Sequence, residues 1–285
     1  MSRSLMSRLL SLPVPTRRLV GLLSVCAAAL VLPACAARLP LEATSAGAVQ
    51  MRGQDRVEAD AADESPVASA APVDVMWANG RWRAQTLPGK KLTVYEPVQL
   101  EGRTCLHASS QASASMLRRK VDIAPADLGH LKFSWRVPAL IEQADLTRRE
   151  GEDSPVRVVL AFDGDHGELD LRTRAMFDLG EMLTGERPPY ATLMYVWENR
   201  QPRESLILNP RTDRIRKIVV ESGAANLGHW LSYERDVVAD YQRAYGRLPG
   251  RLIGIAVMTD SDNTDSEAEA YYADLRLFGA RGQAL

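Results

Sequence analysis

Apolar and polar residues alternate along most of the chain from residue 74 onward, and this pattern predicts a mostly β protein. Leu131, Phe133, Trp135 and Val137 alternate with more polar neighbours, which is typical of a strand with one buried face. The segment 156–162 is almost continuously apolar and predicts a central strand covered on both faces. Further strands are expected at 92–99, 103–108, 113–121, 191–198, 205–209, 214–221, 252–259 and 270–278.

Turn-forming residues separate these strands at short intervals, which favours an antiparallel sandwich or barrel over βαβ units. A helix is expected at 234–245, where apolar and aromatic residues recur at helical spacing before Gly246 and Pro249. A second helical piece is expected within 168–184. The pattern therefore predicts a single antiparallel β-sandwich with one or two short helices.

Residues 1–34 predict a lipoprotein signal peptide. An arginine-bearing start leads into the apolar run 19–32, which is shorter than the roughly 20 residues that span a bilayer. Leu32-Pro33-Ala34-Cys35 follows and resembles the lipobox of bacterial lipoproteins, in which cleavage exposes the cysteine for acylation. We expect Cys35 to anchor the protein in membrane lipid, at a bacterial cell envelope and facing the periplasm. The alternative is an ordinary secretory signal followed by a chance cysteine.

Residues 35–73 are expected to comprise the lipidated cysteine and a flexible linker. The segment after Cys35 is rich in Ala, Ser, Pro, Asp and Glu, and all 17 aromatic residues of the chain lie from Trp77 onward. Without aromatic anchors such a segment buries too little apolar surface to offset its ordering entropy. The folded β-sandwich domain is therefore expected at 74–285.

Charge and cysteine content narrow the partners and the means of stabilisation. Without the four arginines that precede Cys35, 31 basic residues face 36 acidic ones, a net charge of −5. A mildly acidic surface argues against nucleic acid as a partner. Cys105 is the one cysteine after Cys35, so no intramolecular disulfide forms within the domain, and its β-like surroundings predict a small buried side chain.

Common catalytic motifs are absent from the sequence, including Gly-x-Ser-x-Gly, His-Glu-x-x-His and the Walker loop. An acidic loop follows the apolar strand near residue 257, and its oxygens suit calcium if a metal binds at all. The spacing excludes an EF-hand, because no glycine occupies the sixth position and Tyr271 occupies the twelfth. A solvated turn is the simpler interpretation. The metal candidates are Asp260, Asp262 and Asp265.

Arg157 lies within the strand that is expected to be buried, where an unpaired charge is costly. We therefore expect it to pair with a carboxylate, either Asp153 or one in the loop that begins at Asp260. We favour this arginine partner over calcium, because the loop lacks a recognised calcium spacing. The pair is either purely structural or part of a ligand-facing cluster.

Six segments together resemble a bacterial family, the domain of unknown function numbered three thousand and forty-seven. The resemblance spans about Trp77 to Phe278, and it implies an exported or envelope-associated domain with a jelly-roll-like sandwich similar to sugar-binding modules. The family has no established activity, so it supplies no catalytic residues. The matching segments are 113–117, 133–136, 153–157, 195–197, 235–241 and 258–264.

The favoured function is a binding module for an envelope glycan, with aromatic rings for stacking and charged groups for directed hydrogen bonds. One alternative is a glycan hydrolase or lyase that uses paired carboxylates such as Asp153 and Asp260. Another is a structural lipoprotein that binds an envelope protein. Trp135 and Trp197 also fit the core. The ligand-binding candidates are Trp135, Arg136, Asp153, Arg157, Tyr195, Trp197, Arg235, Asp236, Asp260, Asp262, Asn263, Tyr271, Tyr272 and Asp274.

The lipobox yields the first prediction. Cys35→Ala removes the acyl acceptor, so the variant should leave the membrane fraction or stall before processing. Metabolic labelling with an alkyne fatty acid should mark the native protein and not the variant. A native protein that takes up no label and stays soluble would contradict the anchor.

Overall fold

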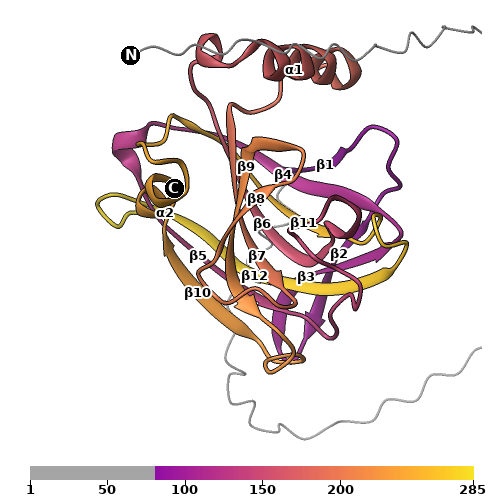
Figure 1. Ribbon diagram of the computed structural model, residues 1–285. Coiled ribbons are helices and arrows are strands. Elements are labelled where there is room, and N and C mark those ends of the chain that lie inside the picture. The colour runs from indigo at the N-terminus through magenta and orange to yellow at the C-terminus, as the bar shows by residue number, and fades with distance from the viewer. Residues whose placement is uncertain (1–80) are drawn as a thin grey trace, which may run out of the picture. The chain divides into compact units, whose positions relative to one another are not determined.

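The computed structural model describes residues 81–285, which form two β-sheets packed face to face (Figure 1). The predicted signal peptide, Cys35 and the predicted linker lie outside the described residues. Within residues 81–285, no helix has both the length and the apolar character required to cross a membrane.

The larger sheet has seven strands in the order β1-β4-β11-β6-β7-β9-β8. Neighbouring strands are antiparallel, except that β7 and β9 are parallel. β6 is central and buried along almost its whole length, as its apolar sequence predicts. The bounds are β1 (Trp82–Thr86), β4 (Ala114–Ile123), β6 (Ser154–Phe162), β7 (Ala191–Glu198), β8 (Leu206–Asn209), β9 (Thr212–Ser222) and β11 (Leu252–Asp260).

The smaller sheet has five antiparallel strands in the order β10-β5-β12-β3-β2. Consecutive strands pass from one sheet to the other, as in β3-β4-β5-β6 and β10-β11-β12. The predicted jelly-roll-like antiparallel sandwich is therefore confirmed. The bounds are β2 (Val94–Leu100), β3 (Arg103–Gln111), β5 (Leu128–Arg136), β10 (Leu231–Asp236) and β12 (Glu267–Gly279).

Both predicted helices are present, but one begins later than its sequence pattern suggests. Residues 231–236 form the edge strand β10, paired with β5, so the helix expected from 234 begins at Val237. The Asp236 side chain accepts a hydrogen bond from the backbone N–H of Ala239 and so caps the N-terminus of this helix. Strand β1 was not predicted. The helices are α1 (Leu171–Thr184), α2 (Val237–Tyr245) and three short 3₁₀ turns, η1 (Pro125–Asp127), η2 (Arg149–Gly151) and η3 (His166–Glu168).

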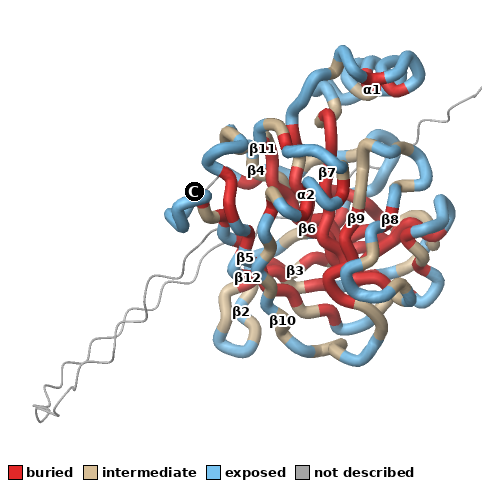
Figure 2. Tube along the Cα trace, turned by 60° about the vertical axis from the view of Figure 1, so that its left-hand side comes forward, coloured by how far each residue is buried: buried red, intermediate tan, exposed pale blue. Residues whose placement is uncertain are grey.

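The main core lies between the sheets and contains large aromatic side chains (Figure 2). Trp135, Tyr195, Trp197 and Tyr272 are at most 1% exposed, so their rings cannot stack on a ligand. These four candidate ligand-binding residues are core residues, because each faces the opposite sheet and packs there. For Trp135 and Trp197 this confirms the core alternative that the sequence also offered. Cys105 is fully buried, as expected.

A second apolar cluster lies apart from this core, on the outer face of the seven-stranded sheet. It includes Val159, Met194, Ala256 and Met258, which belong to the three adjacent strands β6, β7 and β11. Since the opposite faces of these strands contribute to the main core, the sheet is apolar on both sides. The outer face is therefore available to build a second apolar compartment.

Candidate functional site

A groove with a cavity volume of about 580 Å³ runs over the outer face of the seven-stranded sheet. Its size falls within the range typical of small-molecule sites. The floor is aliphatic, with Met116 on β4, Met258 and Ala256 on β11, Val159 on β6 and Met194 on β7. Within residues 81–285, no aromatic side chain lines this groove.

One end of the groove is closed by the segment that follows α1. Gly180 and Thr184 of the helix line this end, together with the loop residue Glu186. The Glu186 carboxylate accepts hydrogen bonds of 2.7 Å from both Arg118 and Lys120 on β4. These two ion pairs hold the loop against the sheet and define the wall.

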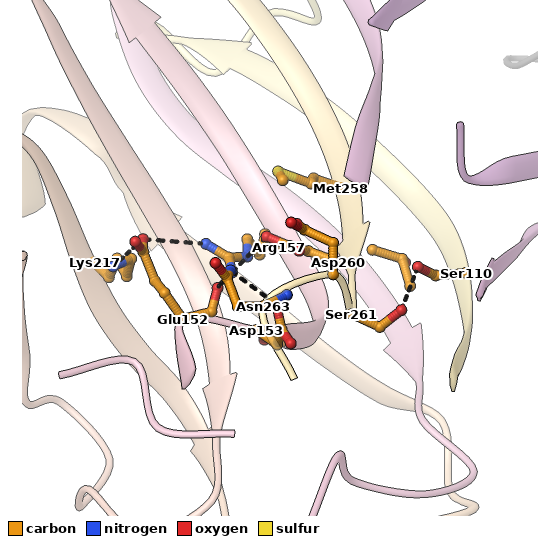
Figure 3. Close-up of polar contacts among 12 residues, drawn as sticks. Ser110, Glu152, Asp153, Arg157, Lys217, Met258, Asp260, Ser261 and Asn263 are labelled. Carbon is orange, nitrogen blue, oxygen red and sulfur yellow. Dashed lines mark hydrogen bonds and ion pairs between the residues drawn. The ribbon is translucent and has the colours of Figure 1, made fainter. Parts of the chain in front are cut away.

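Buried charges close the other end (Figure 3). Side chains alternate across a strand, so Arg157 shares the groove face of β6 with Val159, and Asp260 shares the groove face of β11 with Met258. The guanidinium of Arg157 donates to Asp260 Oδ2 at 2.9 Å and to the backbone oxygen of Glu152 at 2.6 Å. Arg157 is 2% exposed and Asp260 is 4% exposed. The predicted pairing of Arg157 with a carboxylate of the 260 loop is therefore confirmed.

Glu152 is the centre of the remaining contacts. Its carboxylate lies 2.7 Å from Lys217 Nζ and accepts hydrogen bonds of 2.5 Å from Arg211 and from the Asn209 side chain. Lys217 is on β9, and the other two residues belong to the β8–β9 turn region. Glu152 therefore ties the edge of the sheet to the central strand.

Asp153 stabilises the loop that follows β11. It accepts hydrogen bonds from the backbone N–H groups of Asn263 and Thr264 and from both of their side chains. Asp153 does not line the groove, whereas Asp260, Asp262 and Asn263 do. The hydrolase alternative requires Asp153 and Asp260 to lie on either side of a ligand in the groove. They do not, because only Asp260 lines it.

Burial shifts the pKa values of the charged groups in this cluster. Loss of solvation raises the pKa of Asp260 to about 7; Arg157 opposes the shift, and repulsion from Asp153 supports it. Burial and repulsion by Arg157 lower the pKa of Lys217 to about 8, although Glu152 opposes this change. Burial acts to raise the pKa of Asp153, but the hydrogen bonds from Thr264 and Asn263 outweigh it and hold that pKa below its usual value.

Three polar atoms at this end have no hydrogen-bond partner among residues 81–285. Lys217 Nζ has only its ion pair with Glu152, and Lys217 does not line the groove. The other two are Nε of Arg157, a donor, and Oδ1 of Asp260, which is an acceptor when Asp260 is ionised. Buried polar atoms normally have partners, because an unsatisfied one costs about 1–3 kcal/mol. Both residues line the groove, so a ligand placed there can supply the missing partners.

The acidic cluster differs from the predicted metal set. One carboxylate oxygen each from Asp153, Asp260 and Asp262 lies within 4.8 Å of the others. Asp265 is exposed and belongs to no such group among the described residues. Arg157 contacts Asp260 and Lys90 contacts Asp262, so a cation here would approach two positive side chains. Calcium binding stays a prediction.

The other predicted site residues are far from the groove in the fold. Arg136, Tyr271 and Asp274 lie on β5 and β12 of the five-stranded sheet, where Tyr271 and Asp274 are partly or fully exposed. Arg235 pairs with Asp240 at 2.8 Å and with Glu204 at 2.7 Å.

Asp236 caps α2, so it and Arg235 have structural roles. Neither residue lines the groove, and their assignment to a ligand site stays a prediction.

The prediction missed Glu152, Lys217 and Arg211. A signal existed for Lys217, since it lies in an apolar strand segment and, like Arg157, requires a counter-charge there. Glu152 and Arg211 lie in turns, where charged residues are usual, and no pattern distinguishes them.

Comparisons with known proteins identify the family. A family model described as "Protein of unknown function (DUF3047)" matches residues 80–276, and the chain belongs to this family. The predicted family resemblance is thus confirmed. No curated protein matches the chain.

Several solved structures are similar at low identity. The family 11 carbohydrate-binding module of the cellulosomal cellulase Lic26A-Cel5E of Clostridium thermocellum has 10% identity and a TM-score of 0.34, over 70% of this chain and 88% of that chain. The same organism's module in complex with a β-1,3-1,4-mixed-linked tetrasaccharide has 12% identity and a TM-score of 0.35, over 70% and 89%. The xyloglucanase domain of NopAA, a type three effector from Sinorhizobium fredii, in complex with cellobiose has 7% identity and a TM-score of 0.38, over 70% and 92%.

The raised pKa of Asp260 predicts a distinctive pH dependence. Between about pH 4 and 7 the folded state holds a proton on Asp260 that the unfolded state has lost, so the free energy of unfolding falls as the pH rises. Relative to Asp260→Asn, the native protein should lose stability across this window and change little above it. Urea unfolding at several pH values measures the difference.

Asp153→Asn is the matched control. Because the pKa of Asp153 is lowered, this group stabilises the fold above about pH 4 and loses that effect as the pH falls further. Relative to Asp153→Asn, the native protein should therefore gain free energy of unfolding as the pH rises, and this change should occur at lower pH than the change caused by Asp260. A constant difference between native protein and Asp260→Asn would show that Arg157 keeps Asp260 ionised.

Proposed function

We propose that this protein is a non-catalytic binding module of the bacterial cell envelope, held there by acyl chains on Cys35, and that its ligand lies in the groove over β4, β11, β6 and β7. The observation that carries the proposal is an apolar groove of about 580 Å³ that ends at two unsatisfied buried polar atoms. An apolar site with a few fixed polar groups is typical of ligand binding.

The protonation and pairing of the cluster favour binding over hydrolysis. A glycosidase needs two carboxyl groups on either side of the bond, one of them free to act as nucleophile or base. Here Asp153 is outside the groove and Glu152 is bonded to three partners. Asp262 pairs with Lys90, and the one oxygen of Asp260 that lacks a partner is buried.

Gly254 provides a direct test of the groove. It lies on β11 at the end near α1, and a Cβ there would make an ordinary contact of 3.5 Å with Ala161. Gly254→Phe should therefore fold normally and fill the groove with its ring. The apolar fluorophore N-phenyl-1-naphthylamine should bind the native protein saturably at one site and should lose that binding in Gly254→Phe.

Ala239→Phe is the matched control, because residue 239 is an exposed position on α2 that does not line the groove. It adds the same side chain and should leave probe binding unchanged. Equal probe binding by Gly254→Phe and the native protein, or no saturable binding by the native protein, would contradict the groove as the site.

A second candidate function, binding of an envelope glycan, is favoured by the outer face of the five-stranded sheet. There the Tyr271 ring stacks on His107 with centroids 4.8 Å apart, and Arg103 lies 4.7 Å from the centre of the Trp230 ring. Asp274 accepts a hydrogen bond from Arg103 at 3.2 Å. Partly exposed rings beside charged groups offer the stacking and directed hydrogen bonds that a sugar needs.

Trp230→Ala and Tyr271→Ala test this second site. If glycan binds there, each variant should weaken co-sedimentation of the protein with purified peptidoglycan several-fold, since each removes a stacking surface. Gly254→Phe should co-sediment like the native protein. Unchanged co-sedimentation of both alanine variants would exclude this face as the glycan site.

A further inference from the structure

The unsatisfied atoms of Asp260 and Arg157 at the charged end of the groove indicate which hydrogen-bonding group a ligand should carry. When Asp260 is ionised, its Oδ1 lacks a donor and Nε of Arg157 lacks an acceptor, while Oδ2 of Asp260 already accepts a hydrogen bond from the Arg157 guanidinium. The two atoms belong to residues that one ion pair joins. A hydroxyl group both donates and accepts, whereas an ammonium group only donates and a carboxylate only accepts.

The charge of the cluster indicates the charge of its ligand. Above about pH 7, where Asp260 is ionised, the four carboxylates of Glu152, Asp153, Asp260 and Asp262 face four cations. A ligand with a full charge would add an unpaired charge to this largely desolvated end, which is costly. A neutral polar group avoids that cost. The four cations are Lys90, Arg157, Arg211 and Lys217.

The rest of the groove indicates an alkyl chain. Its floor from Met258 through Ala256 to Gly254 follows β11 away from the charged end, and Val159 and Met194 flank it. Methionine and small aliphatic side chains adapt to a flexible chain, and the absence of aromatic rings in the groove leaves no platform for stacking a sugar ring along its length.

We propose that the groove binds a neutral amphiphile with one alkyl chain and a hydroxyl-bearing head, the chain lying over β11 and β6 and one hydroxyl bridging Oδ1 of Asp260 and Nε of Arg157. This inference rests on the proposed function, since it assigns the ligand class of the same groove. An alkyl glycoside is the simplest molecule with this chemistry.

A head-group series on the native protein tests the ligand class. Decyl β-glucoside, decanoate and decyltrimethylammonium share one chain length and differ in the head group. Each is titrated at pH 7.5, above the pKa of Asp260 and below its own micelle concentration, against bound N-phenyl-1-naphthylamine. Decyl glucoside should displace the probe at about tenfold lower concentration than either charged compound, because two hydrogen bonds are gained without burying a charge. Equal displacement by all three, or strongest displacement by a charged compound, would overturn the inference.

The double variant Arg157→Met/Asp260→Leu tests the assigned atoms. Replacing a buried ion pair with apolar residues of similar volume usually preserves folding. This variant should still bind the probe but should lose the preference for decyl glucoside. A retained preference would show that the assignment to these atoms is wrong, and the native head-group series decides the ligand class even if the variant fails to fold.

A matched control exists on the other sheet. Lys132→Met/Glu234→Leu removes an exposed ion pair of 3.2 Å between β5 and β10 of the five-stranded sheet, and neither residue lines the groove. It should keep both probe binding and the head-group preference. If the probe does not bind the native protein at all, the proposed function fails; if the probe binds without head-group preference, only the ligand class fails.

Discussion

The ion pair between Arg157 and Asp260 is the contact on which this end of the domain depends. It joins two adjacent strands of the seven-stranded sheet, β6 and β11, at a place where neither charge reaches water. A charge buried in this way must be compensated locally. The segment 152–153, the turn around 209–211 and the loop 261–264 all fold against this pair or its neighbours. The groove has a polar end because these segments converge there.

The same requirement explains how much of the site could be predicted from the sequence. Arg157 stands out because it interrupts an apolar strand. The sequence offered Asp153 or a carboxylate of the loop from Asp260 as its partner, and the structure selects Asp260. The strands were predictable for a similar reason, since a half-buried strand alternates and a central one is continuously apolar. Lys217 could have been found by the same reasoning as Arg157, because it is a charge in an apolar strand. Glu152 and Arg211 could not, because turns tolerate charged residues without a partner.

Two kinds of error have physical causes. Tryptophan is a residue type that stacks on sugar rings, so Trp135 and Trp197 were candidates for a ligand site. Alternation alone does not say which face of a sheet packs against the other sheet, and both residues are buried there. Strand β10 was predicted as the first turn of a helix, because a six-residue edge strand with exposed alternate positions resembles an amphipathic helix over so short a length. In both cases the deciding information is long-range pairing, which local pattern does not contain.

The two outer faces of the sandwich carry different kinds of side chains. The five-stranded sheet exposes Tyr271, Trp230 and charged side chains, while the seven-stranded sheet presents methionine and small aliphatic residues. An outer sheet face normally meets water, so an apolar one calls for a cover or a ligand. Here α1 and its following loop cover one end, and the ionic cluster closes the other. What remains between them is an apolar floor with an unsatisfied donor and acceptor at its end, and a molecule with an alkyl chain and a neutral hydroxyl suits both features.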